Sequence, residues 1–126
     1  MNDTLYREQL LDIYKDPSNR GTLSDKDIEV TEKNPFCGDV LTLQLKIEDG
    51  IIKDVAFDGG ACVVTIASSA LLTEELRGKM LEEAKAITKQ DVLDMLGVEL
   101  TTSRVKCATL ILEAVSSALR RYEESN

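Results

Sequence analysis

The sequence contains no histidine and no tryptophan among its 126 residues. Without histidine the chain lacks the commonest general base and the commonest metal-binding side chain, so Ser-His and Cys-His hydrolase mechanisms are excluded. Only three tyrosines and two phenylalanines are present, and the core must therefore consist mainly of Leu, Ile, Val and Ala. Hydrophobic residues make up 43% and charged residues 30%, which predicts one globular domain over residues 1–126.

Long apolar runs and basic clusters are also absent. No run is long enough to cross a bilayer, and residues 1–10 lack the hydrophobic stretch of a signal peptide. We therefore expect a cytoplasmic protein with reduced thiols and no membrane partner. The net charge is −8, with basic residues scattered among acids. This disfavours nucleic acid as a partner, because phosphates need a basic surface.

The three cysteines, Cys37, Cys62 and Cys107, are an odd number, which disfavours a closed disulfide framework. In a reducing compartment they can be core residues, reactive thiols or ligands of one shared metal or cluster. Their separations of 25 and 45 residues include no Cys-x-x-Cys pair. Spacing therefore does not choose among these alternatives.

Cys37 stands in the segment NPFCGD, where Pro35 and Gly38 predict a loop. Such a loop has little core for a cysteine to fill, which weakens a purely structural role. Asp39 follows two residues later, and a thiolate together with a carboxylate suits Zn²⁺ or iron. A simple turn role for Asp39 is the alternative.

Cys62 follows Gly59 and Gly60 at the start of a predicted buried helix over 61–77. The positive end of a helix dipole favours a thiolate, and glycines let a ligand approach the backbone. The hydroxyl residues that follow Cys62 are expected to pack or cap this helix. A nucleophilic role is not expected of them, because no base is available.

Cys107 lies near the start of a predicted last helix, between about Ser103 and Glu123, with Arg104 and Lys106 beside it. Cationic neighbours favour a thiolate. Cys107 also lies on the apolar stripe of this helix, so a core role is equally compatible with the sequence. The two basic residues can simply belong to a solvated first turn.

The hydrophobic pattern predicts helices and strands in a definite order. Alternating residues flank Asp49-Gly50, a dipeptide favoured in type I′ hairpin turns. The whole order indicates an α+β fold, in which a small three-stranded antiparallel sheet is packed by an N-terminal helix and several C-terminal helices. The predicted helices cover 4–15, 61–77, 80–86, 89–96 and 103–123, and the predicted strands cover 27–32, 40–47 and 51–57.

The chain resembles the IscU/SufU/NifU N-terminal family of iron–sulfur cluster assembly scaffolds. The resemblance implies that Cys37, Asp39, Cys62 and Cys107 converge at one exposed end of this fold. There they would hold iron or a labile [2Fe–2S] cluster, with Zn²⁺ as the alternative occupant. The resemblance is carried by LYREQLLDIYKDPSNRG (5–21), NPFCGDVLTLQLKI (34–47), IIKDVAFDGGACVVTIASSALLTEELRGK (51–79) and RVKCATLILEAV (104–115).

The same resemblance implies a scaffold rather than an enzyme. Sulfur would arrive as a persulfide from a cysteine desulfurase, and the finished cluster would pass to apoproteins. Cys107 is the candidate persulfide acceptor by analogy with the scaffold branch. Cys37 is the candidate by analogy with the sulfurtransferase branch.

The sequence also departs from both branches of the family. IscU-type scaffolds typically carry a histidine at the position of Lys106, whereas the zinc-dependent SufU type has lysine there, which favours a zinc-dependent sulfurtransferase. The SufU type typically has an insertion between the second and third cysteines, and the 45-residue separation here has no room for it. The segment 97–107 lacks the proline-rich motif that Hsp70-type chaperones recognise in IscU-type scaffolds. A scaffold, a sulfurtransferase and a zinc-stabilised interaction domain all remain open, as do chaperone use and a monomeric or dimeric state.

Overall fold

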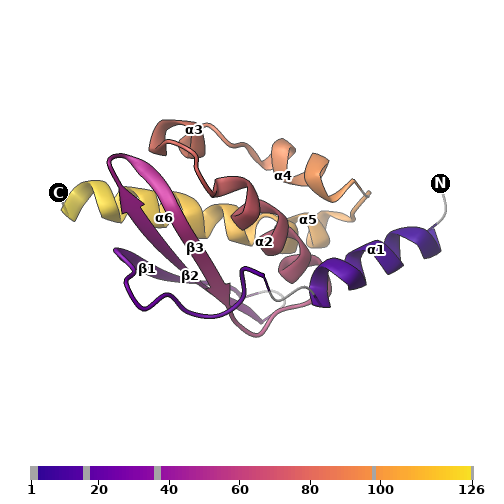
Figure 1. Cartoon of the computed structure of the whole chain (residues 1–126). Coiled ribbons are helices and arrows are strands. Elements are labelled where there is room, and N and C mark those ends of the chain that lie inside the picture. The colour runs from indigo at the N-terminus through magenta and orange to yellow at the C-terminus, as the bar shows by residue number, and fades with distance from the viewer. Residues whose placement is uncertain (1–2, 16–17, 36–37, 98, 126) are drawn as a thin grey trace.

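The computed structural model describes residues 3–15, 18–35, 38–97 and 99–125, without the side chains of 3–7, 9 and 103 (Figure 1). The secondary structure follows the predicted order. The elements are α1 (Asp3–Lys15), β1 (Ile28–Asn34), β2 (Asp39–Glu48), β3 (Ile51–Asp58), α2 (Val63–Leu76), α3 (Leu81–Lys85), α4 (Lys89–Leu96), α5 (Thr102–Ala108) and α6 (Leu110–Ser125).

The sheet is a three-stranded antiparallel meander with the order β1-β2-β3. Asp49 and Gly50 join β2 to β3 with φ angles of 54° and 74°. Positive φ at both central positions is what a type I′ turn requires, so the hairpin prediction is confirmed. The turn sets the register, in which Leu43 lies opposite Phe57. Both of these side chains are buried.

Helices cover one face of this sheet. α6 packs on β1 and β2, and α2 packs on β3, while α1 packs on α2. In Figure 1, α1 extends away from the sheet at one end and α6 reaches the other end. The predicted α+β fold is therefore confirmed. The largest fully buried side chains include Phe57, Leu41, Leu43, Leu45, Ile52, Ile66, Leu72, Leu76, Leu110 and Ile111.

The predicted last helix, 103–123, is in fact two helices, and this prediction was wrong. α5 ends and α6 begins around Thr109, whose φ and ψ are −96° and 1°. The Thr109 hydroxyl donates to the carbonyl of Val105 at 2.9 Å. Bonds of this kind can bend a helix, but Thr73 makes the same bond inside the unbroken α2, so the break is defined by the backbone of Thr109. α5 is consequently a short separate helix that carries Cys107.

The buried helix α2 contains several polar side chains. The hydroxyls of Ser69 and Thr73 each donate to a carbonyl four residues earlier, at 2.7 Å in both cases. Within the described residues, no buried side-chain nitrogen or oxygen lacks a hydrogen-bond partner. No helix in the described ranges is both long and apolar enough to cross a membrane.

Candidate metal centre

The site forms where the loop that follows β3 approaches the start of β2. The backbone N–H of Val40 donates to the carbonyl of Gly60 at 3.0 Å. Gly59 has a φ of +148°, and a Cβ at this position would lie 2.0 Å from the carbonyl oxygen of Val40. Only glycine fits here. This close approach brings the residue before Val40, Asp39, next to the residue that opens α2, Cys62.

Three of the predicted site residues come together at this point. Asp39 is the first residue of β2, Cys62 is the N-cap of α2, and Cys107 lies in α5. One carboxylate oxygen and the two sulfur atoms all lie within 4.8 Å of one another. Two ligands of a tetrahedral zinc ion at about 2.3 Å lie about 3.8 Å apart. An inward shift of about 1 Å or less would therefore let all three atoms bind one ion.

Hydrogen bonds hold the Asp39 carboxylate in this position. The backbone N–H of Cys62 donates to its Oδ1 at 3.1 Å, and the Thr65 hydroxyl donates to its Oδ2 at 2.5 Å. Asp39 is 5% exposed and Cys107 is 2% exposed, whereas Cys62 is only partly buried. The accessible side of the site is therefore the side of Cys62.

Thr65 is the site residue that the sequence analysis did not identify. It was expected to pack or cap the helix, but its hydroxyl lies within hydrogen-bonding distance of Asp39, of the Cys62 sulfur and of the Cys107 carbonyl. Residues three apart share a face of a helix, so its spacing from Cys62 was a usable signal. The contacts with Asp39 and Cys107 span 26 and 42 residues, and no local pattern predicts them.

The other predicted site residues are placed differently. Cys37 lies outside the described residues. Arg104 and Lys106 are exposed on α5, three residues and one residue before Cys107, and neither side chain is of a type that usually binds zinc or iron. The structure therefore gathers three of the four predicted ligands from three separate elements.

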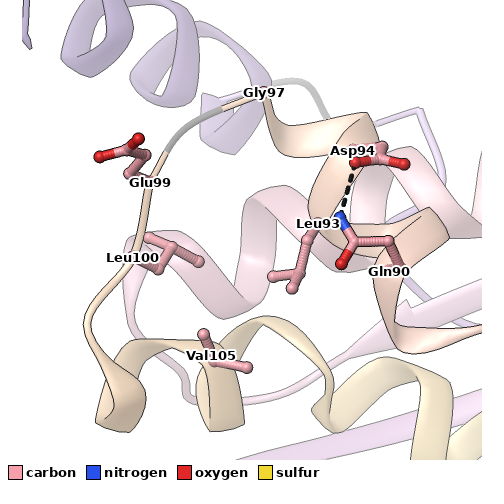
Figure 2. A pocket seen from close by; sticks show the side chains of 7 residues that line it. All are labelled: Gln90, Leu93, Asp94, Gly97, Glu99, Leu100 and Val105. Atoms are coloured by element: carbon pink, nitrogen blue, oxygen red, sulfur yellow. Dashed lines mark hydrogen bonds between the residues drawn. The ribbon is translucent and has the colours of Figure 1, made fainter.

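A separate pocket is lined by residues of α4 and α5 and by none of Asp39, Cys62 and Cys107. Figure 2 shows it between α4, the turn at Gly97 and the start of α5. Apolar side chains line one part, and at another part the amide of Gln90 donates to Asp94 at 2.9 Å. Its described lining residues are Gln90, Leu93, Asp94, Gly97, Glu99, Leu100 and Val105.

Comparison with known protein families gives one match that spans almost the whole chain. The model of the NifU-like N terminal domain matches residues 5–126. This chain belongs to the NifU-like N-terminal family. The resemblance found in the four sequence segments is thereby confirmed.

Relatives in this family carry two different functional names. The iron–sulfur cluster assembly scaffold protein IscU of Haemophilus influenzae is 41% identical, over 94% of this chain and 95% of its own length. The zinc-dependent sulfurtransferase SufU of Bacillus subtilis is 33% identical, over 98% of this chain and 95% of its own length. The SufU alignment spans 141 positions, more than the 126 residues present here. SufU therefore has residues with no counterpart in this chain.

Solved structures of the NifU-like family share the fold. The N-terminal part of a nitrogen-fixing NifU-like protein from Brucella abortus superposes with a TM-score of 0.83 and covers 98% of each chain, at 23% sequence identity. At that identity the similarity concerns the fold alone. The superposition shows that the two proteins share the same arrangement of sheet and helices.

Proposed function

We propose that this protein is an iron–sulfur cluster assembly scaffold of the cytoplasm, consisting of one domain. It receives sulfur from a cysteine desulfurase, assembles a labile [2Fe–2S] cluster on Cys37, Asp39, Cys62 and Cys107, and transfers the cluster to apoproteins. The cluster is cargo, and the protein is a carrier rather than an enzyme.

The observation that supports this proposal most directly is the convergence of Asp39, Cys62 and Cys107 within 4.8 Å. If the cysteines only filled the core, a carboxylate that is 5% exposed would not be expected to lie beside two of them. Thiolates are the usual ligands of iron–sulfur clusters, and a carboxylate is a harder and weaker ligand for that iron. Cys37 precedes Asp39 by two residues in the sequence.

Sulfur transfer to the site is a thiol exchange. The thiolate of an acceptor cysteine attacks the outer sulfur of the desulfurase persulfide, forms a new S–S bond, and releases the desulfurase thiolate. Reduction of this sulfur to sulfide needs two electrons from an external donor. Cys107 and Cys37 are the candidate acceptors. Because Cys107 is 2% exposed, its sulfur must become more accessible before it can accept sulfur.

A zinc-dependent sulfurtransferase is the second candidate function. Lys106 precedes Cys107 where IscU-type scaffolds typically have histidine, and the chain contains no histidine at all. In this function Zn²⁺ would be held by the same residues, two or three thiolates and Asp39, until sulfur is accepted and passed on. The short separation between Cys62 and Cys107, which leaves no room for the insertion typical of the SufU type, favours the scaffold.

Anaerobic reconstitution separates the two functions. The full chain is incubated with a cysteine desulfurase, cysteine and Fe²⁺, and visible absorption and Mössbauer spectra are recorded. A scaffold gives the spectra of a [2Fe–2S] cluster, with about two iron and two sulfide ions bound per chain. The Cys62→Ser variant is the matched control and should give much less cluster.

The same experiment can also exclude the scaffold function. If no cluster spectrum appears while zinc stays tightly bound, the scaffold function is wrong. Formation of a protein persulfide in the zinc-loaded chain would then support the sulfurtransferase. If the chain binds neither zinc nor a cluster, both functions are excluded.

A further inference from the structure

Thr65 contacts every residue of the described ligand cluster through one hydroxyl group. It lies one turn into α2, three residues after Cys62, and its side chain is 0% exposed. The hydroxyl oxygen lies 2.5 Å from Oδ2 of Asp39, 3.3 Å from Sγ of Cys62 and 3.2 Å from the carbonyl oxygen of Cys107. Because these residues come from β2, α2 and α5, Thr65 stands at the junction of the three elements.

The Thr65 hydroxyl has only one hydrogen to donate. Its shortest contact is with the Asp39 carboxylate, and O–H···O⁻ bonds of this length are strong. Oδ1 of the same carboxylate accepts the N–H of Cys62. Both oxygens of Asp39 therefore have protein donors at the place where Asp39 would bind a metal.

Two other acceptors lie within reach of the same hydrogen. Rotation of the hydroxyl can direct it to the Cys107 carbonyl or to the Cys62 sulfur, at 3.2 and 3.3 Å. Leaving a buried donor unpaired is costly, but these alternatives keep the hydrogen of Thr65 paired after it leaves Asp39. The geometry thus allows Asp39 to exchange a hydrogen bond for a metal bond without an orphaned hydroxyl.

We infer that Thr65 is a positioning residue that competes with the bound metal or cluster for Oδ2 of Asp39. This competition keeps Asp39 an exchangeable ligand and sets the rate at which the cargo leaves. The inference rests on the proposed function, because it requires Asp39 to be a ligand. A residue that only packs the start of α2 would affect stability without controlling release through Asp39.

The test measures metal release from the full chain. The protein is loaded with Co²⁺, whose visible and thiolate charge-transfer bands report sulfur ligation, and excess EDTA is added. Thr65→Val removes the hydroxyl and keeps the shape, so release should become about tenfold slower, as expected for the loss of one hydrogen bond to a charged group. Thr65→Ser keeps the hydroxyl and should release within about twofold of the original rate.

A second pair of variants, both lacking Asp39, tests whether Thr65 affects metal release through Asp39. In an Asp39→Ala chain, adding Thr65→Val should change the release rate by less than about twofold, because the competing oxygen is gone. Circular dichroism melting of each metal-free variant confirms that it is folded. Should Thr65→Val not fold, Thr65→Ala serves as the variant without the hydroxyl, with the same expected slowing.

Each outcome has one meaning. Slower release that depends on Asp39 supports the inference. Normal cobalt uptake with unchanged or faster release in both hydroxyl-free variants overturns the role of Thr65 and leaves the proposed function in place. Slowing that persists in the Asp39→Ala background also overturns it. A chain that takes up no cobalt with thiolate bands overturns the inference together with the proposed function.

Discussion

The backbone N–H of Cys62 donates to the carboxylate of Asp39 at 3.1 Å and so joins the start of α2 to the start of β2. This bond places a carboxylate oxygen beside a cysteine that is 23 residues further along the chain. Cys107 reaches the same place from α5. The consequences of this arrangement can be tested residue by residue.

Asp39 should limit the lifetime of a bound cluster. Because a carboxylate holds iron less firmly than a thiolate, ligand exchange begins at Asp39. Asp39→Ala should therefore prolong the half-life of the reconstituted cluster, as followed by visible absorption. Asp12→Ala, which removes an exposed carboxylate of α1, is the control and should leave the half-life unchanged. An unchanged lifetime in Asp39→Ala would remove Asp39 from the site.

The two described cysteines should differ in their reactivity. Cys62 is partly exposed, whereas Cys107 is 2% exposed. In the metal-free chain, iodoacetamide should modify Cys62 about tenfold faster than Cys107, because modification of a buried thiol requires local opening. Peptide mass spectrometry measures both rates. Zinc should protect both cysteines if they share one ion, and protection of only one of them would contradict a shared site.

Gly59 should be essential to the geometry of the site. A Cβ at Gly59 would lie 2.0 Å from the Val40 carbonyl oxygen, and the φ of +148° is unfavourable for other residues. Gly59→Ala should lower the free energy of unfolding by about 3 kcal/mol and weaken zinc binding. Gly60→Ala is the matched control, because open space surrounds its added Cβ. Similar melting temperatures for the two variants would contradict this account.

Lys106 should assist sulfur transfer without holding the metal. Its side chain is exposed beside Cys107, and a nearby cation stabilises a thiolate and attracts an anionic persulfide. Lys106→Ala should slow persulfide transfer from a desulfurase by about fivefold at low salt, and less at high salt. Lys106→Arg should restore most of the rate, and Lys53→Ala, an exposed lysine of β3, should not change it.

Zinc affinity provides the second readout for Lys106. Lys106→Ala should bind zinc within about twofold of the unmodified chain, because the ammonium group is not a ligand. A large loss of zinc affinity with an unchanged transfer rate would reverse the assigned role.

Much of the fold followed from local patterns. Strict alternation in β2 placed Leu41, Leu43 and Leu45 on one face, and all three are 0% exposed. Asp49-Gly50 specified the hairpin through positive φ angles. The predicted helix over 89–96 is α4, where the structure has a capping box at Thr88 and a left-handed C-cap at Gly97. These features depend on residues close in sequence, so the sequence alone predicted them.

The break between α5 and α6 was not predictable in this way. The apolar stripe continues through Thr109, so periodicity indicated a single helix. The break lies at Thr109, whose backbone leaves helical geometry, and threonine occurs in many unbroken helices, including α2 at Thr73. Packing of the Cys107 carbonyl against Thr65 adds a constraint from another part of the chain.

The sequence by itself determined which residue types were available: three cysteines, an aspartate two residues after the first of them, and no histidine. It also determined the family through the motifs around those residues. Only the tertiary structure decided that Asp39, Cys62 and Cys107 meet within 4.8 Å, with Thr65 between them. The physical reason is that this meeting depends on long-range packing of β2, α2 and α5. The spacing of residues along the chain carries no information about that packing.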